Sequence, residues 1–118
     1  MSHDPYQILP NPFSLDGYSV IITGAGGAIG GATAHVLAQA GANVVVSDLN
    51  LDAAEKVAAD VQKATGRETL AMRTDVTSEA EQQALIDATL KTFGKITALI
   101  NNVGWGEYTP LWDVSMDY

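Results

Sequence analysis

Short runs of apolar residues alternate with longer, helix-length segments along this chain, beginning near Tyr18. Apolar runs of this kind are typical of strands that are buried on both faces of a parallel sheet. When a helix connects two parallel strands, the connection is right-handed and the helix covers one face of the sheet. The alternation therefore predicts an α/β fold, with a doubly wound parallel sheet of about four strands and three helices.

Local signals place the ends of these elements. Asn50 is a suitable N-cap for the second helix. Ser78, with Glu81 three residues later, has the capping-box pattern, in which each side chain accepts a hydrogen bond from the other residue's backbone amide. Glycines follow the helices and stop them. The predicted strands are residues 19–23, 43–48, 69–73 and 96–101, and the predicted helices are residues 28–40, 51–64 and 78 to about 94.

The first predicted helix repeats apolar residues at helical spacing. This repeat is typical of a helix face that packs against the core. We therefore expect that face to be buried. Its residues are Ile29, Ala32, Val36, Leu37 and Ala40.

The composition excludes several classes of partner and site. Six Lys and Arg stand against fourteen Asp and Glu, a net charge of −8, so neither nucleic acid nor an anionic membrane is an expected partner. The chain has no cysteine and only two histidines, which removes thiolate ligands and leaves no metal-ligand spacing. No apolar run approaches the roughly 20 residues that a membrane helix needs. We expect a soluble, cytoplasmic protein without a metal site.

The chain divides into an arm and one domain. Residues 1–12 contain three of the four prolines and show no periodicity, so they are predicted to form an irregular N-terminal arm. They also lack the basic start and apolar centre of a signal peptide. Residues 13–118 suffice for one modest core, and we expect them to form a single domain.

The first predicted strand leads into a glycine-rich turn, residues 23–30, which reads Thr-Gly-Ala-Gly-Gly-Ala-Ile-Gly. Backbone N–H groups and the positive dipole end at a helix N-terminus attract anions such as a pyrophosphate. We assign a tight turn to Gly24, close approach of a ligand to residues 26–28, and helix-against-strand packing to Gly30. Glycines also close ordinary strand-to-helix loops, so the turn alone does not establish a phosphate site.

Asp48 ends the second predicted strand. A carboxylate there can accept hydrogen bonds from both hydroxyls of an adenosine ribose, and it would repel a 2′-phosphate. No Lys or Arg occurs from Gly24 to Glu55, so we expect no cation near Asp48 that could neutralise that phosphate. This pattern favours NAD over NADP. The alternative is an ordinary solvated aspartate at a strand end.

Two further motifs follow the third and fourth predicted strands. Asp75 and Val76 come where the same scaffold would place an adenine ring, although Asp75 could instead simply start a turn. The motif Asn-Asn-Val-Gly at residues 101–104 lies at the carboxyl edge, where ligands bind in open α/β sheets. Its two amides could tie neighbouring strands together and form a wall of the cleft. Otherwise the motif is a loop that favours Asn and Gly.

Taken in order, these motifs are Thr-Gly-xxx-Ala-x-Gly, an acidic strand end, Asp-Val and Asn-Asn-x-Gly. This order resembles that of the short-chain dehydrogenase/reductase family over residues 13–118. Within the family, residues 44–48 look like those of bacterial NAD-dependent hydroxysteroid dehydrogenases of the 7α type. The resemblance implies a Rossmann-type fold with the cofactor NAD. The cofactor-binding residues that it implies are Gly24, Gly26, Gly27, Ala28, Ile29, Gly30, Asp48, Leu49, Asp75, Val76, Asn102, Val103 and Gly104.

The resemblance also implies an activity, the interconversion of a secondary alcohol and a ketone. In this family a lysine lowers the pKa of a tyrosine, and that tyrosine exchanges a proton with the substrate. These two residues and the family's serine lie beyond the fourth strand, and no tyrosine of this chain has a lysine four residues later. We therefore expect no catalytic residue here, and read the chain as the cofactor-binding front half of a longer protein. The resemblance implies a homodimer or homotetramer at full length.

The sequence departs from the family pattern at two cofactor-site positions. Ala28 stands where the family usually has a glycine, and Val103 replaces the usual alanine, so each adds bulk to the wall of the cleft. One rival reading is a non-catalytic dinucleotide-binding module or a truncated product. Another is a nucleotide-binding methyltransferase with a similar glycine loop, which the motif at residues 101–104 disfavours.

Overall fold

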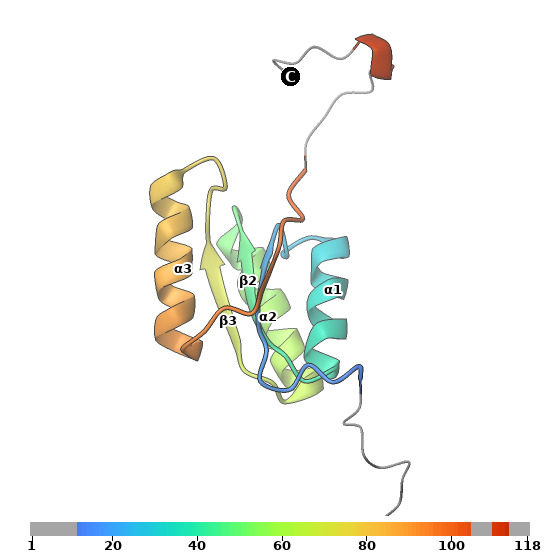
Figure 1. The fold of residues 1–118 in the computed structure, drawn as a ribbon, viewed down its shortest axis with the longest axis vertical. Coiled ribbons are helices and arrows are strands. Elements are labelled where there is room, and N and C mark those ends of the chain that lie inside the picture. Colours follow the sequence, from blue (N-terminus) through green and yellow to red (C-terminus); the bar gives the residue numbers. More distant parts are fainter. Residues whose placement is uncertain (1–11, 105–109, 114–118) are drawn as a thin grey trace, which may run out of the picture.

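The computed structural model describes residues 12–104 and 110–113 (Figure 1). All but the last residue of the predicted arm therefore lies outside the described part. The elements are β1 (Ser19–Thr23), α1 (Ala28–Gln39), β2 (Asn43–Asp48), α2 (Leu51–Thr65), β3 (Thr69–Arg73), α3 (Glu79–Phe93), β4 (Ala98–Ile100) and a short 3-10 helix, η1 (Leu111–Asp113).

The four strands form one parallel sheet in the order β3-β2-β1-β4. The predicted α/β class and the predicted bounds of β1, β2 and β3 are confirmed. β4 is shorter than predicted because it pairs with β1 over three residues only. Beyond them, side-chain hydroxyls continue the contact, since Thr97 Oγ1 accepts a hydrogen bond from Ser19 N at one end of β4 and Thr23 Oγ1 accepts one from Asn102 N at the other.

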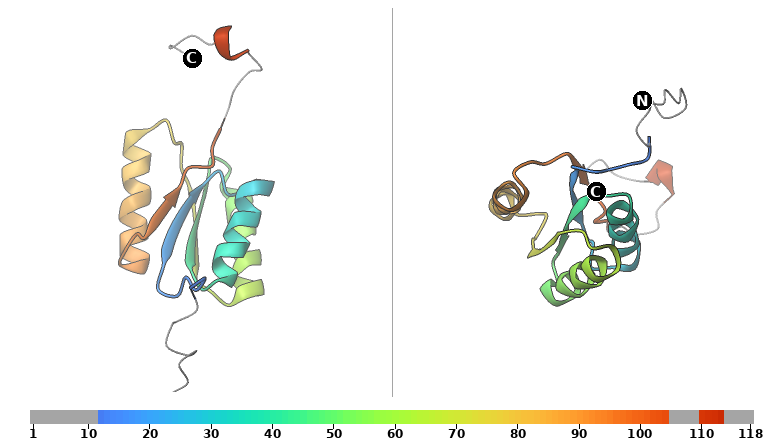
Figure 2. Two further views of the ribbon diagram at one scale, coloured as in Figure 1. Left: turned by 45° about the vertical axis from the view of Figure 1, so that its right-hand side comes forward. Right: turned by 90° about the horizontal axis from the view of Figure 1, so that it is seen from below.

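The helices cover both faces of the sheet. α1 and α2 pack on one face and α3 on the other, as Figure 2 shows. Successive residues of a strand point to opposite faces, so Val20, Ile22, Val44 and Val46 belong to the core under α1 and α2. Their neighbours Ile21 and Val45 pack against Leu85 of α3 instead. Both cores depend on the unbroken apolar strands that predicted a parallel sheet.

The ends of α2 and α3 follow the predicted caps. The Asn50 side chain accepts a hydrogen bond from Ala53 N at 3.1 Å, and the Ser78 side chain accepts one from Glu81 N at 3.2 Å. Gly66 and Gly94 end the two helices in the left-handed conformation, with φ of 71° and 79°. The capping box is only half formed, however, because the Glu81 carboxylate contacts Arg73 and Asp75 N and not Ser78 N. That half of the prediction is wrong.

The buried face of α1 also differs from the prediction. The helix packs through Gly30, Gly31, Ala34 and Ala38, whereas Ile29 is 76% and Val36 62% exposed. Among the other predicted core residues, Ala32 is exposed and Leu37 and Ala40 are partly buried. The physical reason is distance: α1 starts directly after the β1 turn and lies so close to it that only small side chains fit between them.

Candidate functional site

A cleft of about 430 Å³ opens at the carboxyl edge of the sheet. The chain segments that follow all four strands contribute to it, which is where ligands bind in open α/β folds. Most of its lining was predicted from the sequence, but Thr74 and Thr77 were not. Thr74 is 2% exposed, and its hydroxyl has no hydrogen-bond partner in the described part of the chain. The lining residues are Gly24, Asp48, Leu49, Thr74, Asp75, Val76, Thr77, Asn102, Val103 and Gly104.

The glycine-rich turn has the close contacts that its sequence predicts. Gly24 adopts a φ of 64°, in the left-handed region. A side chain at Gly30 would have its Cβ 2.7 Å from both Ala25 Cα and Gly24 O. These contacts fit the assigned roles, a tight turn at Gly24 and close packing at Gly30.

The start of α1 offers backbone N–H groups rather than side chains. Gly27 is the N-cap and has no side chain to satisfy the first-turn amides, which have no partner within the helix. Ala28 and Ile29 do not line the cleft, and their side chains lie in a separate shallow groove on the outer face of α1. Any contribution of these two residues to anion binding in the cleft would come from their backbone and the helix dipole.

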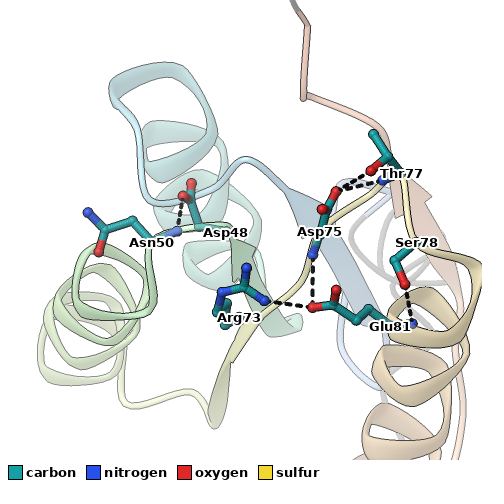
Figure 3. Close-up of polar contacts among 7 residues, drawn as sticks. All are labelled: Asp48, Asn50, Arg73, Asp75, Thr77, Ser78 and Glu81. Atoms are coloured by element: carbon teal, nitrogen blue, oxygen red, sulfur yellow. Dashed lines mark hydrogen bonds and ion pairs between the residues drawn. The ribbon is translucent and has the colours of Figure 1, made fainter.

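The Asp48 carboxylate is held in place by two backbone amides. Its Oδ2 accepts a hydrogen bond from Gly26 N at 2.9 Å. Its Oδ1 accepts one from Asn50 N, also at 2.9 Å (Figure 3). Gly26 is required for this contact, because a Cβ there would lie 2.9 Å from Asp48 Cγ and from Ala53 Cβ. A carboxylate offers about four lone-pair sites, so both oxygens can still accept hydrogen bonds from a ligand.

Arg73 lies beside Asp48, which the sequence interpretation missed. The pairing of β2 with β3 sets Asp48 directly opposite Arg73. The two residues are 25 positions apart in the sequence, and α2 lies between them. The expectation that no cation lies near Asp48 is therefore wrong. Figure 3 shows the Arg73 guanidinium bound to Glu81, with a distance of 2.7 Å from Nη1 to Oε1.

Asp75 both lines the cleft and starts a turn. Its Oδ1 accepts hydrogen bonds from the Thr77 hydroxyl at 2.6 Å and from Thr77 N at 2.9 Å. These two bonds, assisted by the positive charge of Arg73, hold the pKa of Asp75 below its ordinary value. The two readings of Asp75 left open by the sequence are therefore compatible, because the turn orders a carboxylate that lies at the cleft.

Replacing Thr77 with Val should raise the pKa of Asp75, since it removes the hydroxyl hydrogen bond that lowers this pKa most. A lowered pKa in the folded state contributes stability above the unfolded pKa, and this contribution is lost as pH falls through the folded value. The variant should therefore lose less stability than the parent as the solution is acidified. Carboxyl-carbon NMR titration checks the shift, and an unchanged Asp75 pKa in Thr77→Val would contradict it.

Asn101 and Asn102 have different positions. Asn102 Nδ2 donates to Gly24 O at 3.3 Å, so its amide joins the end of β4 to the turn after β1. Asn101 is exposed and lines a groove of about 160 Å³ between α3 and the sheet. Only one of the two amides thus forms the predicted tie between neighbouring strands and a wall of the cleft.

The described residues contain neither a membrane-spanning helix nor a cluster of metal ligands. Across residues 12–104 and 110–113, no helix combines the length and apolar character needed to cross a membrane. In the same residues, no three His, Asp or Glu side chains are grouped so that they could hold a metal ion.

With this geometry established, comparison with known proteins defines the class. A family model described as short chain dehydrogenase matches residues 18–117. The chain therefore belongs to the short-chain dehydrogenase family, as its motif order predicted.

Individual relatives agree with this assignment. The chain is 48% identical over 96 residues to 7alpha-hydroxysteroid dehydrogenase of Escherichia coli (strain K12), an alignment that covers 81% of this chain and 37% of that protein. It is 38% identical over 98 residues to cyclohexanol dehydrogenase of Acinetobacter sp. (strain SE19), covering 83% of this chain and 38% of the relative. The chain thus spans less than two fifths of the length of these relatives.

Solved structures give the same result. A 7α-hydroxysteroid dehydrogenase complexed with NADH and 7-oxo glycochenodeoxycholic acid superposes with a TM-score of 0.78 and 46% identity, covering 89% of this chain and 40% of that one. NAD+-bound xylitol dehydrogenase superposes with a TM-score of 0.76 and 39% identity, covering 91% of this chain and 40% of that one.

Proposed function

We propose that this chain is the NAD(H)-binding part of an oxidoreductase that interconverts a secondary alcohol and a ketone. The observation that carries the proposal is Asp48, a carboxylate that two backbone amides hold at the strand end lining the cleft. The bound NADH and NAD+ in the two similar structures support the choice of cofactor. The named relatives that act on a hydroxysteroid or cyclohexanol support the choice of substrate class.

Each part of the cleft fits one part of the proposed cofactor. The Asp48 oxygens would accept hydrogen bonds from the ribose hydroxyls, and the free amides at the start of α1 would face the pyrophosphate. Asp75 and Val76 would contact the adenine ring. With a net charge of −8, the protein would hold the phosphates mainly through backbone N–H groups.

The chemistry of the reaction would be shared between two parts of the full protein. When bound, the nicotinamide supplies hydride transfer. The residues described here bind and orient the cofactor, and the proton exchange with the substrate is assigned to Ser, Tyr and Lys residues downstream. We further propose that the full-length protein is a cytoplasmic homo-oligomer, by analogy with the family.

Calorimetric titration with NAD and NADP tests the cofactor assignment. We expect NAD to bind at least about tenfold more tightly, because Asp48 would face the 2′-phosphate as a like charge. Equal affinity, or a preference for NADP, would contradict the proposed role of Asp48. A folded chain that binds neither dinucleotide would overturn the proposal that these residues form a cofactor site.

A further inference from the structure

The sheet places a cation, Arg73, beside Asp48. Ala71 and Val46 pack in the same core under α1 and α2. Two residues later along each strand, Arg73 and Asp48 are paired in register, so strand alternation places both on that same face. A guanidinium there has the geometry and charge to bind a phosphate. Arg73 could therefore offset the repulsion between Asp48 and a 2′-phosphate.

Glu81 engages this guanidinium from the opposite side of the sheet. It belongs to α3, which covers the other face, and its Oε1 lies 2.7 Å from Arg73 Nη1 (Figure 3). The same oxygen accepts a hydrogen bond from Asp75 N at 3.4 Å. Glu81 thus joins Arg73 at the end of β3 to the backbone of a cleft residue.

The Glu81 carboxylate takes this position in place of its usual helix-capping one. In a complete capping box the Ser78 amide would donate a hydrogen bond to the Glu81 carboxylate. Here it donates instead to Asp75 O at 3.0 Å. The Glu81 side chain is therefore free to act as the counter-ion of Arg73. Arg73 itself does not line the cleft, but the pair is partly accessible, with side chains 50% and 38% exposed, which leaves the guanidinium open to anions in solution.

We propose that Glu81 is a positioning residue that sets cofactor specificity by occupying Arg73. Glu81 neutralises the guanidinium and holds it toward α3, so Arg73 is not available to bind a 2′-phosphate. Asp48 repels that phosphate directly. The ligand class selected is an adenosine nucleotide with a free 2′-hydroxyl. This inference rests on the proposed function, because it assumes that the ribose lies at Asp48.

The test uses ligands that need only the adenosine end of the cleft. AMP and adenosine 2′,5′-bisphosphate differ by the 2′-phosphate, and NMR titration of the chain measures both dissociation constants even when binding is weak. In Glu81→Gln, we expect the affinity for the bisphosphate relative to AMP to rise about 3- to 10-fold, since a competing anion is removed from Arg73. The double variant Arg73→Gln/Glu81→Gln should lose this gain.

A matched control separates this contact from a general change of charge. Glu79 is an exposed acidic residue in the same first turn of α3, so Glu79→Gln removes an equal charge from the same helix end and should leave the ratio unchanged. An unchanged ratio in Glu81→Gln, an equal rise in Glu79→Gln, or a gain that persists without Arg73 would each overturn the inference. If the unaltered chain binds AMP and NAD, such a result leaves the proposed function standing. If it binds neither, the proposed function fails and the inference fails with it.

Discussion

Gly30→Ala is expected to lower the free energy of unfolding by about 2 kcal/mol. The added Cβ would lie 2.7 Å from Ala25 Cα and Gly24 O and 2.8 Å from Asn102 Nδ2. Two of these three atoms are backbone, so the helix, the turn or both must move. Overpacking of this kind costs roughly 1–3 kcal/mol and occasionally more, against a gain of up to about 1 kcal/mol in helix propensity. Urea unfolding followed by circular dichroism measures the difference.

The neighbouring glycine provides the matched control for Gly30→Ala. Gly31 is also buried in α1, but a Cβ there meets its nearest atoms, Ala25 O and Val57 Cγ2, at 3.5 Å. Gly31→Ala gains the same helix propensity without the clash, so it should be neutral or stabilising by up to about 1 kcal/mol. The two variants should therefore differ by about 2–3 kcal/mol. Equal stability of the two would show that α1 does not pack on the turn as closely as described.

Asp48→Asn is expected to weaken NAD binding by about 10- to 100-fold. Hydrogen bonds to a charged acceptor contribute roughly 1.5–3 kcal/mol, and asparagine has neither the charge nor the second acceptor oxygen. Because Gly26 N and Asn50 N each donate to one carboxylate oxygen, the variant also leaves one of these amides without an acceptor. Calorimetric titration with NAD measures the loss in affinity.

The control for Asp48→Asn is Asp52→Asn. Asp52 is an exposed residue in the first turn of α2, so this variant removes an equal charge four residues later without altering the lining of the cleft. Its affinity for NAD should stay within about twofold of the parent, as expected of a screened surface charge. An Asp48→Asn variant that binds NAD as well as Asp52→Asn does would contradict the assignment of Asp48 to the ribose.

Local sequence determined most of the secondary structure of this protein. The bounds of β1, β2 and β3 follow from apolar runs. As predicted, Asn50 and Ser78 cap the starts of α2 and α3, and Gly66 and Gly94 cap their ends. The helix signals are reliable because a helix cap is satisfied by residues that are neighbours along the chain. The parallel sheet and its carboxyl-edge cleft then follow from right-handed connections.

Only the tertiary structure decided which face of α1 is buried. Apolar periodicity favoured the face of Ile29 and Val36, which is exposed, and the helix packs through its glycines and alanines. Hydrophobicity cannot distinguish these two faces, since both are apolar. The choice depends on how closely the helix approaches the turn, and that distance is set by atoms elsewhere in the chain.

The charges around the cleft show the same division. The sequence identified Asp48 and Asp75, because Asp48 ends its own strand and Asp75 comes two residues after the end of its strand. The sequence did not predict that Arg73 lies beside Asp48, because that pairing requires β3 to lie next to β2. Nor did it predict that Glu81 contacts Arg73 instead of the capping amide, because that contact requires α3 to pack on the sheet. Sequence alone thus determined the helix caps and the ends of three of the four strands described. Tertiary pairing decided which charges meet, because electrostatic contacts depend on distance in space and not on separation along the chain.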